Sequence, residues 1–471
     1  MFNRGGFCNY LKMKSIREVA GVKVNKFIMT VALAGLMSGS AWAKWTYYKV
    51  GDELPDGTKA TYAFMTDGDW VLKASMRGAS APTIEQYPED GVLDLSTVWD
   101  DITNEDDYWK DMWFNQARFA IKNCSQLKKL ILPSSGMTTY GNSIFSGNTE
   151  LLEIAGTACV TNIKNYVFQG CSKLTTISAT FDAVQVIGQY AFSDNPVLTG
   201  DLSFPALELL ANNAFYNPNK AKPCKVTSFS APKCVTVGTS AFYGDEDLTN
   251  VVVSPEVSSL AAGSFEHCYG LKHFSPEIAP KTLELENFIG AFTRCTNLNQ
   301  RLTLHRATAD NFDFTRKSPW SRAGFTEIDM SNCAGTFTWS DAFAYCASIE
   351  KIWFPSNQTL YAANALQTVA PDLRVYLTGR KPTSQFSSWF DNRTSYSFRI
   401  YYDPKMDSAW KTSFTELTAL TDAERARADF PSDLEPGQVV TGTWTLGGVK
   451  GWCVKYRSPL RKPQGLILIL R

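Results

Sequence analysis

Two stretches of the sequence share one skeleton and decide the fold: VIGQYAFSDNPVL, residues 186–198, and TVGTSAFYGDEDL, residues 236–248. Each contains a glycine, then an Ala-Phe pair, then Asn or Asp three residues after the Phe and Leu three residues further on. A skeleton that recurs at fixed spacing indicates stacked units, each too small to bury its own apolar face. The chain is therefore predicted to be a repeat protein.

The repeat extends through the middle of the chain when the second residue of the Ala-Phe pair is taken as an anchor. Consecutive anchors lie 23 to 28 residues apart. The eleven anchors are Ile121, Phe145, Phe168, Phe192, Phe215, Phe242, Phe265, Phe292, Trp320, Phe343 and Leu366. This regularity predicts a solenoid of about eleven units.

Each unit has a regular interior, as in FQGCSKLTTI, residues 168–177. A Cys or a small or polar residue stands three positions after the anchor, and an aliphatic residue stands six positions after it. The residues that follow favour a strand and often end in proline, as in FSAP and IWFP, because proline cannot donate to a ladder. These strands predict a β-rich solenoid and disfavour the alternative of an amphipathic helical array. Gly188 and Gly238, shortly before their anchors, predict a tight turn at positive φ.

This pattern resembles the BspA-type leucine-rich repeats, whose units read roughly aliphatic-Gly-x-x-Ala-Phe-x-x-Cys-x-x-Leu-x-x-Ile. The resemblance covers residues 112–380. Two units depart from it: the insertion YNPNKAKPCK follows Phe215, and the Trp320 unit lacks the usual Ala. Relatives of this type are described as adhesins that bind extracellular matrix proteins, so the resemblance implies a surface-exposed binding protein.

The N-terminal residues 1–43 are predicted to be a Sec signal peptide. Four basic residues between Lys14 and Lys26 precede an apolar run at 27–37, and Ala41-x-Ala43 offers a cleavage site. The apolar run is too short to span a bilayer, which needs roughly 20 residues. We therefore expect a secreted or cell-surface protein with no integral membrane segment after signal removal; Met13 is an alternative start.

The remaining segments flank the repeats at 112–380. Residues 44–111 are predicted to form an N-terminal β cap, and residues 381–430 a C-terminal strand-helix cap whose helix starts near Met406. Residues 431–471 are predicted to be a β-hairpin tail that turns at Gly447-Gly448, because alternating residues flank that pair.

Composition and motifs argue against several classes of function. The 46 basic and 46 acidic residues cancel, which disfavours nucleic acid as a partner. The chain contains neither an H-E-x-x-H motif nor a phosphate-binding Gly loop, so no catalytic residue, cofactor or metal is predicted and the protein is expected not to be an enzyme. Neighbouring His267, Cys268 and His273 are interpreted as structural rather than as a zinc site. The acidic stretch 100–111 is interpreted as a solvated loop, with weak calcium binding as the alternative.

Ten cysteines follow the predicted signal peptide. At least five occupy the small internal position of the repeat, where Cys behaves as a small hydrophobe, so most are predicted to be free. Cys124 and Cys171 lie two units apart, which is too far for a disulfide. Cys268 and Cys295 lie in neighbouring units, so theirs is the one pairing within reach.

The repeat register places two columns of side chains outward on one continuous sheet surface. The first column is Lys129, Glu153, Thr176, Asp201, Ser228, Asn250, His273, Arg301, Glu327, Lys351 and Arg374. The second column is Ile131, Ala155, Ser178, Ser203, Ser230, Val252, Ser275, Thr303, Asp329, Trp353 and Tyr376.

The C-terminal end of these columns combines aromatic and basic residues, which is the composition of an interaction hot spot. We therefore predict Lys351, Trp353, Arg374 and Tyr376 as ligand-binding residues, with cover by the C-terminal cap as the alternative. The predicted function is non-enzymatic adhesion to a host or matrix protein or a glycan. Two alternatives stay open: a polysaccharide-associated module of an enzyme system, and a structural component of a surface layer.

Overall fold

The computed structural model describes residues 45–61, 64–73, 84–98, 121–217, 225–275, 290–306, 312–313, 320–333, 337–338, 343, 345–354, 360–361, 372–377, 399–403, 420–428, 430–446 and 449–456. Several predicted features lie outside these residues: the signal peptide, the acidic stretch 100–111, most of the insertion after Phe215, the Leu366 anchor and the helix start near Met406.

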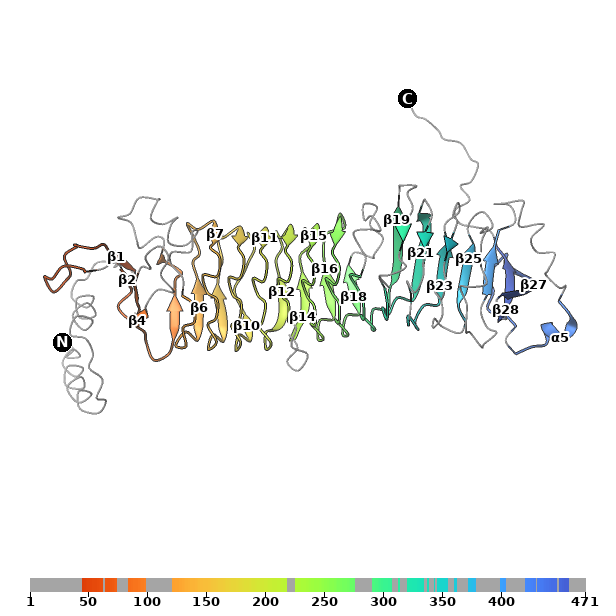
Figure 1. Ribbon diagram of the computed structural model, residues 1–471, viewed down its shortest axis with the longest axis horizontal. Helices are drawn as coiled ribbons and strands as arrows, with labels where there is room; N and C mark the ends of the chain where they lie inside the picture. The colour runs from red at the N-terminus through yellow and green to blue at the C-terminus, as the bar shows by residue number, and fades with distance from the viewer. Residues whose placement is uncertain are drawn as a thin grey trace, which may run out of the picture.

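The chain forms an elongated β-solenoid whose parallel strands stack along the long axis (Figure 1). In the described part of the chain the one helix is the four-residue α5, Asp422–Arg425, so the predicted β-rich solenoid is confirmed and the helical array is excluded there. The count of eleven units and the capping of both ends stay predictions.

An antiparallel sheet precedes the solenoid. It comprises β1 (Thr46–Tyr48), β2 (Phe64–Thr66), β3 (Val71–Lys73) and β4 (Ile84–Gln86). The next strand, β5 (Val92–Asp94), already pairs in parallel with the solenoid. The buried indoles of Trp45 and Trp70 donate hydrogen bonds to the β5 carbonyls of Asp94 (2.8 Å) and Val92 (2.7 Å). These two bonds fasten the N-terminal sheet to the first solenoid strand.

One face of the solenoid consists of three sheets that follow one another along the long axis. The first has the order β10-β8-β6-β5, the second β12-β14-β16-β18, and the third β19-β21-β23-β25-β26-β28-β27. The strands are β6 (Lys129–Leu132), β8 (Glu153–Gly156), β10 (Thr176–Ile177), β12 (Thr199–Ser203), β14 (Lys225–Ser230), β16 (Asn250–Val252), β18 (His273–Ser275), β19 (Arg301–Arg306), β21 (Glu327–Cys333), β23 (Lys351–Phe354), β25 (Arg374–Leu377), β26 (Arg399–Tyr402), β27 (Val439–Leu446) and β28 (Val449–Lys455).

β27 and β28 pair in antiparallel fashion and form a hairpin. The predicted turn at Gly447-Gly448 lies outside the described residues, and the bounds of the tail at 431–471 stay a prediction. β28 also pairs in parallel with β26, so the hairpin continues the third sheet of the solenoid.

A second ladder of two-residue strands runs along the solenoid and was not predicted. It consists of a six-stranded sheet and a three-stranded sheet, both parallel. The strands are β7 (Thr139–Tyr140), β9 (Asn162–Ile163), β11 (Val186–Ile187), β13 (Leu209–Leu210), β15 (Thr236–Val237) and β17 (Ser259–Leu260), then β20 (Phe312–Asp313), β22 (Phe337–Thr338) and β24 (Leu360–Tyr361). Each turn of the coil between Thr139 and Leu260 therefore contributes a strand to this ladder.

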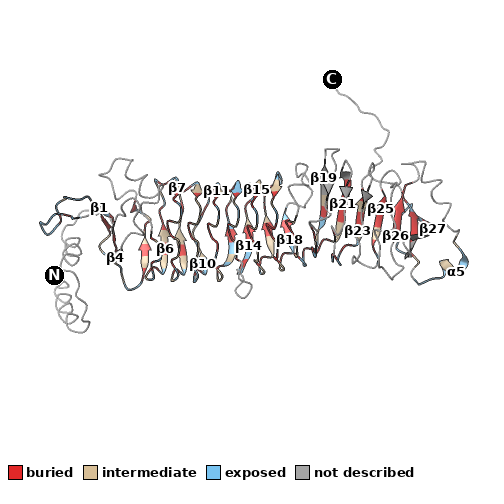
Figure 2. Cartoon of the chain, in the orientation of Figure 1, coloured by how far each residue is buried: buried red, intermediate tan, exposed pale blue. Residues whose placement is uncertain are grey.

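The anchor residues form a stack through the buried core. Figure 2 shows buried residues in the strands along the length of the solenoid. Phe192, Phe215 and Phe242 are almost parallel, with neighbouring ring centroids 5.1 Å apart. The same stacking joins Phe145 to Phe168, Phe168 to Phe192, Phe242 to Phe265, Phe265 to Phe292, and Trp320 to Phe343. The anchors thus form one layer of the core, and its spacing is close to that of neighbouring strands, about 4.8 Å.

In six turns the position three residues after the anchor holds a hydrogen-bond donor that joins that turn to the preceding one. The Cys171 thiol donates to the Phe145 carbonyl (3.4 Å), and the Asn195 amide donates to the Phe168 carbonyl (3.0 Å). Asn148, Cys268, Cys295 and Cys346 donate to the preceding anchor in the same way. Since this position is buried, its donor satisfies a backbone carbonyl that water cannot reach.

Eight cysteines are free, which confirms the prediction for those eight: Cys124, Cys159, Cys171, Cys234, Cys268, Cys295, Cys346 and Cys453. The Cys268–Cys295 pairing, the one within reach by sequence, is not formed, because each thiol donates to a different anchor carbonyl: Cys268 to Phe242 (3.2 Å) and Cys295 to Phe265 (3.0 Å).

The prediction of positive φ at Gly188 and Gly238 is wrong. A Cβ on Gly188 would lie 2.6 Å from the Lys164 carbonyl carbon, so this glycine is required by the close approach of the preceding turn. Left-handed residues instead flank most anchors at two positions before and two after. They are Ser143, Tyr166, Tyr190, Asn213, Ser240, Gly263 and Gly290 before the anchor, and Asn123, Gly147, Gly170, Asp194, Gly244, His267, Arg294, Arg322 and Tyr345 after it.

Candidate binding surface

The two predicted columns exist as cross-strand pairs. In β23 and β25, Lys351 pairs with Arg374 and Trp353 pairs with Tyr376. The same register continues through the third sheet and within the first and second sheets. We call the surface formed by the two columns the sheet face. The four predicted ligand-binding residues therefore lie together on two adjacent strands, in the register that the repeat spacing predicts.

Trp353 is held rigidly and stays half-buried. Its ring stacks on Tyr376 with centroids 4.7 Å apart and planes 11° apart. The guanidinium of Arg301 lies over the Trp353 ring, 4.5 Å from its centroid, in a cation–π contact. Trp353 thus offers an aromatic surface whose orientation is fixed before any partner binds.

Tyr376 belongs instead to a buried aromatic cluster. It is 7 % exposed and stacks on Tyr401 at 4.4 Å, while the ring of Tyr456 contacts both tyrosines edge-on. Leu420, Phe430 and Leu434 of the C-terminal segment pack against this cluster. Burial, followed by the nearby Tyr401, raises the pKa of Tyr376 well above its ordinary value. Tyr376 therefore supports Trp353 from beneath and offers little surface of its own.

The basic residues of the predicted site have acidic partners. The Lys351 ammonium lies 2.6 Å from Glu327, and Arg301 contacts Glu327 and Asp329. Arg374 (2.7 Å) and Arg399 (2.5 Å) share the carboxylate of Asp433. Burial opposes ionisation of Asp433, but the hydrogen bond from Arg399 and the charges of both arginines outweigh it and lower the pKa of Asp433. This end of the sheet face is a network of mixed charge around one aromatic ring.

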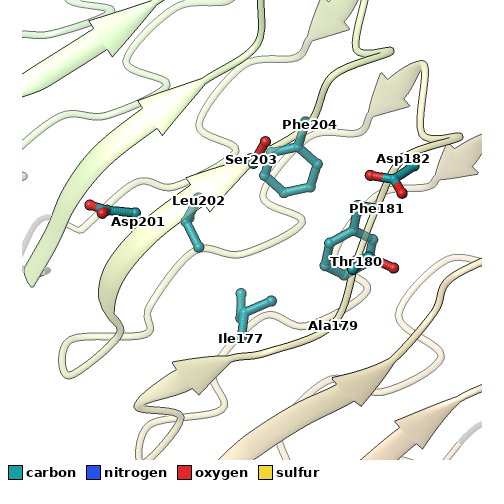
Figure 3. Close-up of a pocket in the computed structure, with 9 residues that line it drawn as sticks. All are labelled: Ile177, Ala179, Thr180, Phe181, Asp182, Asp201, Leu202, Ser203 and Phe204. Atoms are coloured by element: carbon teal, nitrogen blue, oxygen red, sulfur yellow. The ribbon is translucent and has the colours of Figure 1, made fainter.

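The sheet face is interrupted at two places, which differ in how they are closed. Between β18 and β19 the side-chain amide of Gln300 accepts from the Phe274 N–H (3.0 Å) and donates to the Phe274 carbonyl (2.9 Å), so the side chain replaces a neighbouring strand. Between β10 and β12 a pocket of about 130 Å³ opens, lined by Ile177 and Leu202 among other residues. Figure 3 shows Asp182 and Asp201 on opposite sides of it.

The residues that could suggest metal chemistry do not converge. Cys268 is buried in the internal position and His273 is exposed on β18, as predicted. The His267 Nδ1 lies 2.6 Å from the Tyr269 hydroxyl. Within the described ranges no group of three His, Cys, Asp or Glu side chains is placed to hold a metal ion. In the same ranges no helix is both long and apolar enough to cross a membrane.

Comparison with known proteins identifies the repeat. A family model described as "BspA type Leucine rich repeat region" matches residues 117–222 and 221–309, in six copies. No curated protein matches the chain.

Three solved structures are similar at low sequence identity. A leucine-rich repeat protein from Bacteroides ovatus ATCC 8483 is 21% identical, with a TM-score of 0.36, over 59% of this chain and 61% of its own, so the chain spans less than two thirds of that protein. A leucine rich cell surface protein from Faecalibacterium prausnitzii A2-165 is 14% identical (TM-score 0.26; 76% of this chain, 98% of that one). The pneumococcal vaccine antigen PcpA is 11% identical (TM-score 0.27; 78% and 96%).

The family match covers the turns in which the anchor stack and the internal donor ladder are most regular. The repeat register, the buried anchors and this match together identify the turns at residues 117–309 as BspA-type leucine-rich repeats.

Proposed function

We propose that this protein is an exported, non-enzymatic binding protein that attaches to a protein or glycan through the C-terminal end of the sheet face. The single observation that carries the proposal is the half-buried Trp353, fixed between Arg301 and Tyr376. A large aromatic side chain that is already ordered loses little entropy on binding, and such residues dominate interaction hot spots.

The surroundings of Trp353 favour a macromolecular partner over a small molecule. Lys351 and Arg374, next to it on the sheet face, are half-buried and ion-paired, which gives a polar rim around an aromatic centre. A small ligand would need a concave site, whereas an extended sheet face suits a broad partner surface.

The test is a binding screen of the chain from Lys44 onward against arrays of matrix proteins and glycans. The variant Lys351→Ala/Trp353→Ala removes the aromatic centre and one cation while leaving the buried Tyr376 in place. Its matched control is Lys129→Ala/Ile131→Ala, which changes the same two columns at the other end; Lys129 is also ion-paired, with Glu153 at 2.8 Å.

We expect at least one partner, whose affinity falls tenfold or more in the Lys351/Trp353 variant and stays unchanged in the control. Equal losses in both variants, or no partner at micromolar protein, would contradict the proposal. Concentration-dependent self-association without a foreign partner would favour the alternative of a structural surface-layer component.

Export is part of the same proposal and has its own readout. Cleavage after Ala43 predicts that the protein recovered outside the cytoplasm begins at Lys44. N-terminal sequencing of the exported protein tests this, and a protein retained in the cytoplasm with residues 1–43 intact would contradict it.

A further inference from the structure

A second aromatic surface lies outside the strands of the sheet face. Six rings form a continuous row across successive turns, each contacting the next with centroids 5.1 to 6.5 Å apart. The row consists of Tyr166, Tyr190, Tyr216, Tyr243, His267 and Tyr269. We call it the tyrosine row. Its members stand next to the anchors from Phe168 to Phe265, so the row spans five turns.

The fold does not require hydroxyl groups in this row. The five tyrosines are half-buried, whereas the apolar core of the same turns is filled by the anchor phenylalanines. In the described part of the chain the hydroxyls of Tyr166, Tyr190, Tyr216 and Tyr243 make no hydrogen bond, while that of Tyr269 contacts His267. A tyrosine hydroxyl can donate and accept a hydrogen bond, so four of them in one row are available to a ligand or to water.

Two tyrosines of the row also occupy costly backbone positions. Tyr166 has φ of 62° and Tyr190 has φ of 55°, in the left-handed region where Gly or Asn is the less strained choice. Their rings stack face to face at 5.3 Å with planes 7° apart. A strained tyrosine pair on a surface indicates a role for the side chains that local stability does not supply.

The electrostatics of the row favour an uncharged ligand. Burial is the main cause of a raised Tyr243 pKa; Glu266 raises it further and Arg294 opposes that rise, so one acidic and one basic side chain act on the same ring. Near the other end the Gln169 amide donates to the Asp194 carboxylate (3.3 Å). Neither end presents the cluster of like charge that would attract a polyanion or a polycation.

We propose that the tyrosine row binds a neutral linear polysaccharide laid along the solenoid axis. Sugar rings present apolar C–H faces together with hydroxyls, which match aromatic rings that carry free hydroxyls. The turns repeat at close to one strand spacing, about 4.8 Å, so successive sugars can meet equivalent positions on successive turns. This surface is separate from Trp353, so the result of testing one proposal does not decide the other.

The test measures affinity by titration calorimetry with four soluble probes, cellohexaose, xylohexaose, mannohexaose and chitohexaose, and with the shorter oligosaccharides of each series from the disaccharide upward. The variant Tyr190→Ala/Tyr216→Ala removes the centre of the row, and Tyr190→Phe/Tyr216→Phe keeps the rings and removes only the hydroxyls. The matched control is Tyr345→Ala, because Tyr345 is 60 % exposed, outside the row, and shares the left-handed backbone of Tyr190.

We expect at least one probe to bind, with affinity that rises from the disaccharide to about five sugars because the row spans five turns. The alanine variant should weaken binding at least tenfold, the phenylalanine variant less, and Tyr345→Ala or Lys351→Ala/Trp353→Ala not at all. The phenylalanine variant, whose apolar rings keep the stack, guards against loss of binding through misfolding.

Three outcomes would overturn the proposal. They are the absence of binding to all four probes, an affinity independent of chain length, and equal losses in the row and control variants. A protein found in the array screen whose binding depends on Tyr190 and Tyr216 would likewise assign the row to a protein interface.

Discussion

Replacing Gly188 by Ala tests whether the turns of this solenoid touch through their backbones. The added Cβ would lie 2.6 Å from the carbonyl carbon of Lys164 and 2.6 Å from the Asn165 amide oxygen, where ordinary contact begins at 3.4 Å. The two turns would have to separate locally by several tenths of an ångström. They are joined at this point by the hydrogen bond from the Gly188 N–H to the Ile163 carbonyl, 2.7 Å long.

The expected cost follows from this overlap. Overpacking of a well-packed interior costs about 1–3 kcal/mol, and an overlap with backbone that cannot rotate away belongs in the upper half of that range, about 2–3 kcal/mol. The matched comparison is Gly170→Ala. Gly170 has φ of 69° and open space around a Cβ, so Ala there costs only the left-handed strain, about 1 kcal/mol.

The assay is the free energy of unfolding from urea titration, followed by circular dichroism, for the wild type and both variants. Gly238→Ala should lose about as much as Gly188→Ala, because a Cβ at Gly238 would lie 2.5 Å from the Asn212 nitrogen. If Gly188→Ala lost no more free energy than Gly170→Ala, the close approach of turns would not be what requires this glycine.

Three further predictions concern the core and the sheet break. Phe215→Ala should lower the free energy of unfolding by about 4–5 kcal/mol and Phe215→Leu by less than half of that, because Leu fills the cavity but loses the two ring contacts at 5.1 Å. Urea titration measures both; equal losses would contradict the cavity contribution, and no loss in Phe215→Leu would contradict the ring contribution. Cys171→Asn should cost under about 1 kcal/mol and Cys171→Val about 1–2 kcal/mol, because only Asn keeps a donor for the Phe145 carbonyl; the same titration decides the order. Gln300→Ala should speed hydrogen exchange of the Phe274 amide at least tenfold through loss of the amide bridge, and unchanged exchange would show that the bridge does not protect this edge.

The buried thiols also predict a pH dependence. Burial raises the pKa of Cys171 to about 12 and that of Cys234 to about 11, from the ordinary thiol value of 9.0. Since the pKa values are raised in the folded state, the neutral thiols favour folding fully below pH 9, and this contribution is lost as the pH rises from about 9 towards 12. The free energy of unfolding should fall over that window, and the fall should be smaller in a Cys171→Asn/Cys234→Ala variant. An equal fall in both proteins would contradict the assignment to these thiols.

The sequence predicts those features that follow from the regular spacing of the anchors. Because each unit repeats the same spacing, the pairs Lys351–Arg374 and Trp353–Tyr376 could be placed on neighbouring strands without a structure. The fate of Tyr376 could not be predicted in this way, because the residues that pack on its cluster, Phe430 and Leu434, lie more than fifty positions later in the chain.

Other features were missed because their sequence signal is short or not local. The second ladder is built from two-residue strands, which carry too little alternation to be recognised. The role of Gly188 depends on how closely the preceding turn approaches. The sequence does not distinguish a glycine that is required by close contact from one that is required by positive φ. The tyrosine row escaped notice because its members stand at different positions relative to their anchors, so the alignment that revealed the repeat did not bring them together.

The interruption of the sheet face between β18 and β19 has a mechanical consequence. A load along the axis passes from turn to turn through backbone hydrogen bonds. At the step from β18 to β19 neither strand ladder is continuous in the described residues, and the turns are joined there by bonds beside the anchors, such as that from the Phe265 N–H to the Ala291 carbonyl (2.9 Å). A rod stretched from its ends should part there first. A turn of 24 residues, such as Phe168 to Phe192, occupies roughly 5 Å of the long axis when it is stacked. Once released and fully extended, the same turn would span about 80 Å. The solenoid would thereby act as an extensible tether that yields in steps.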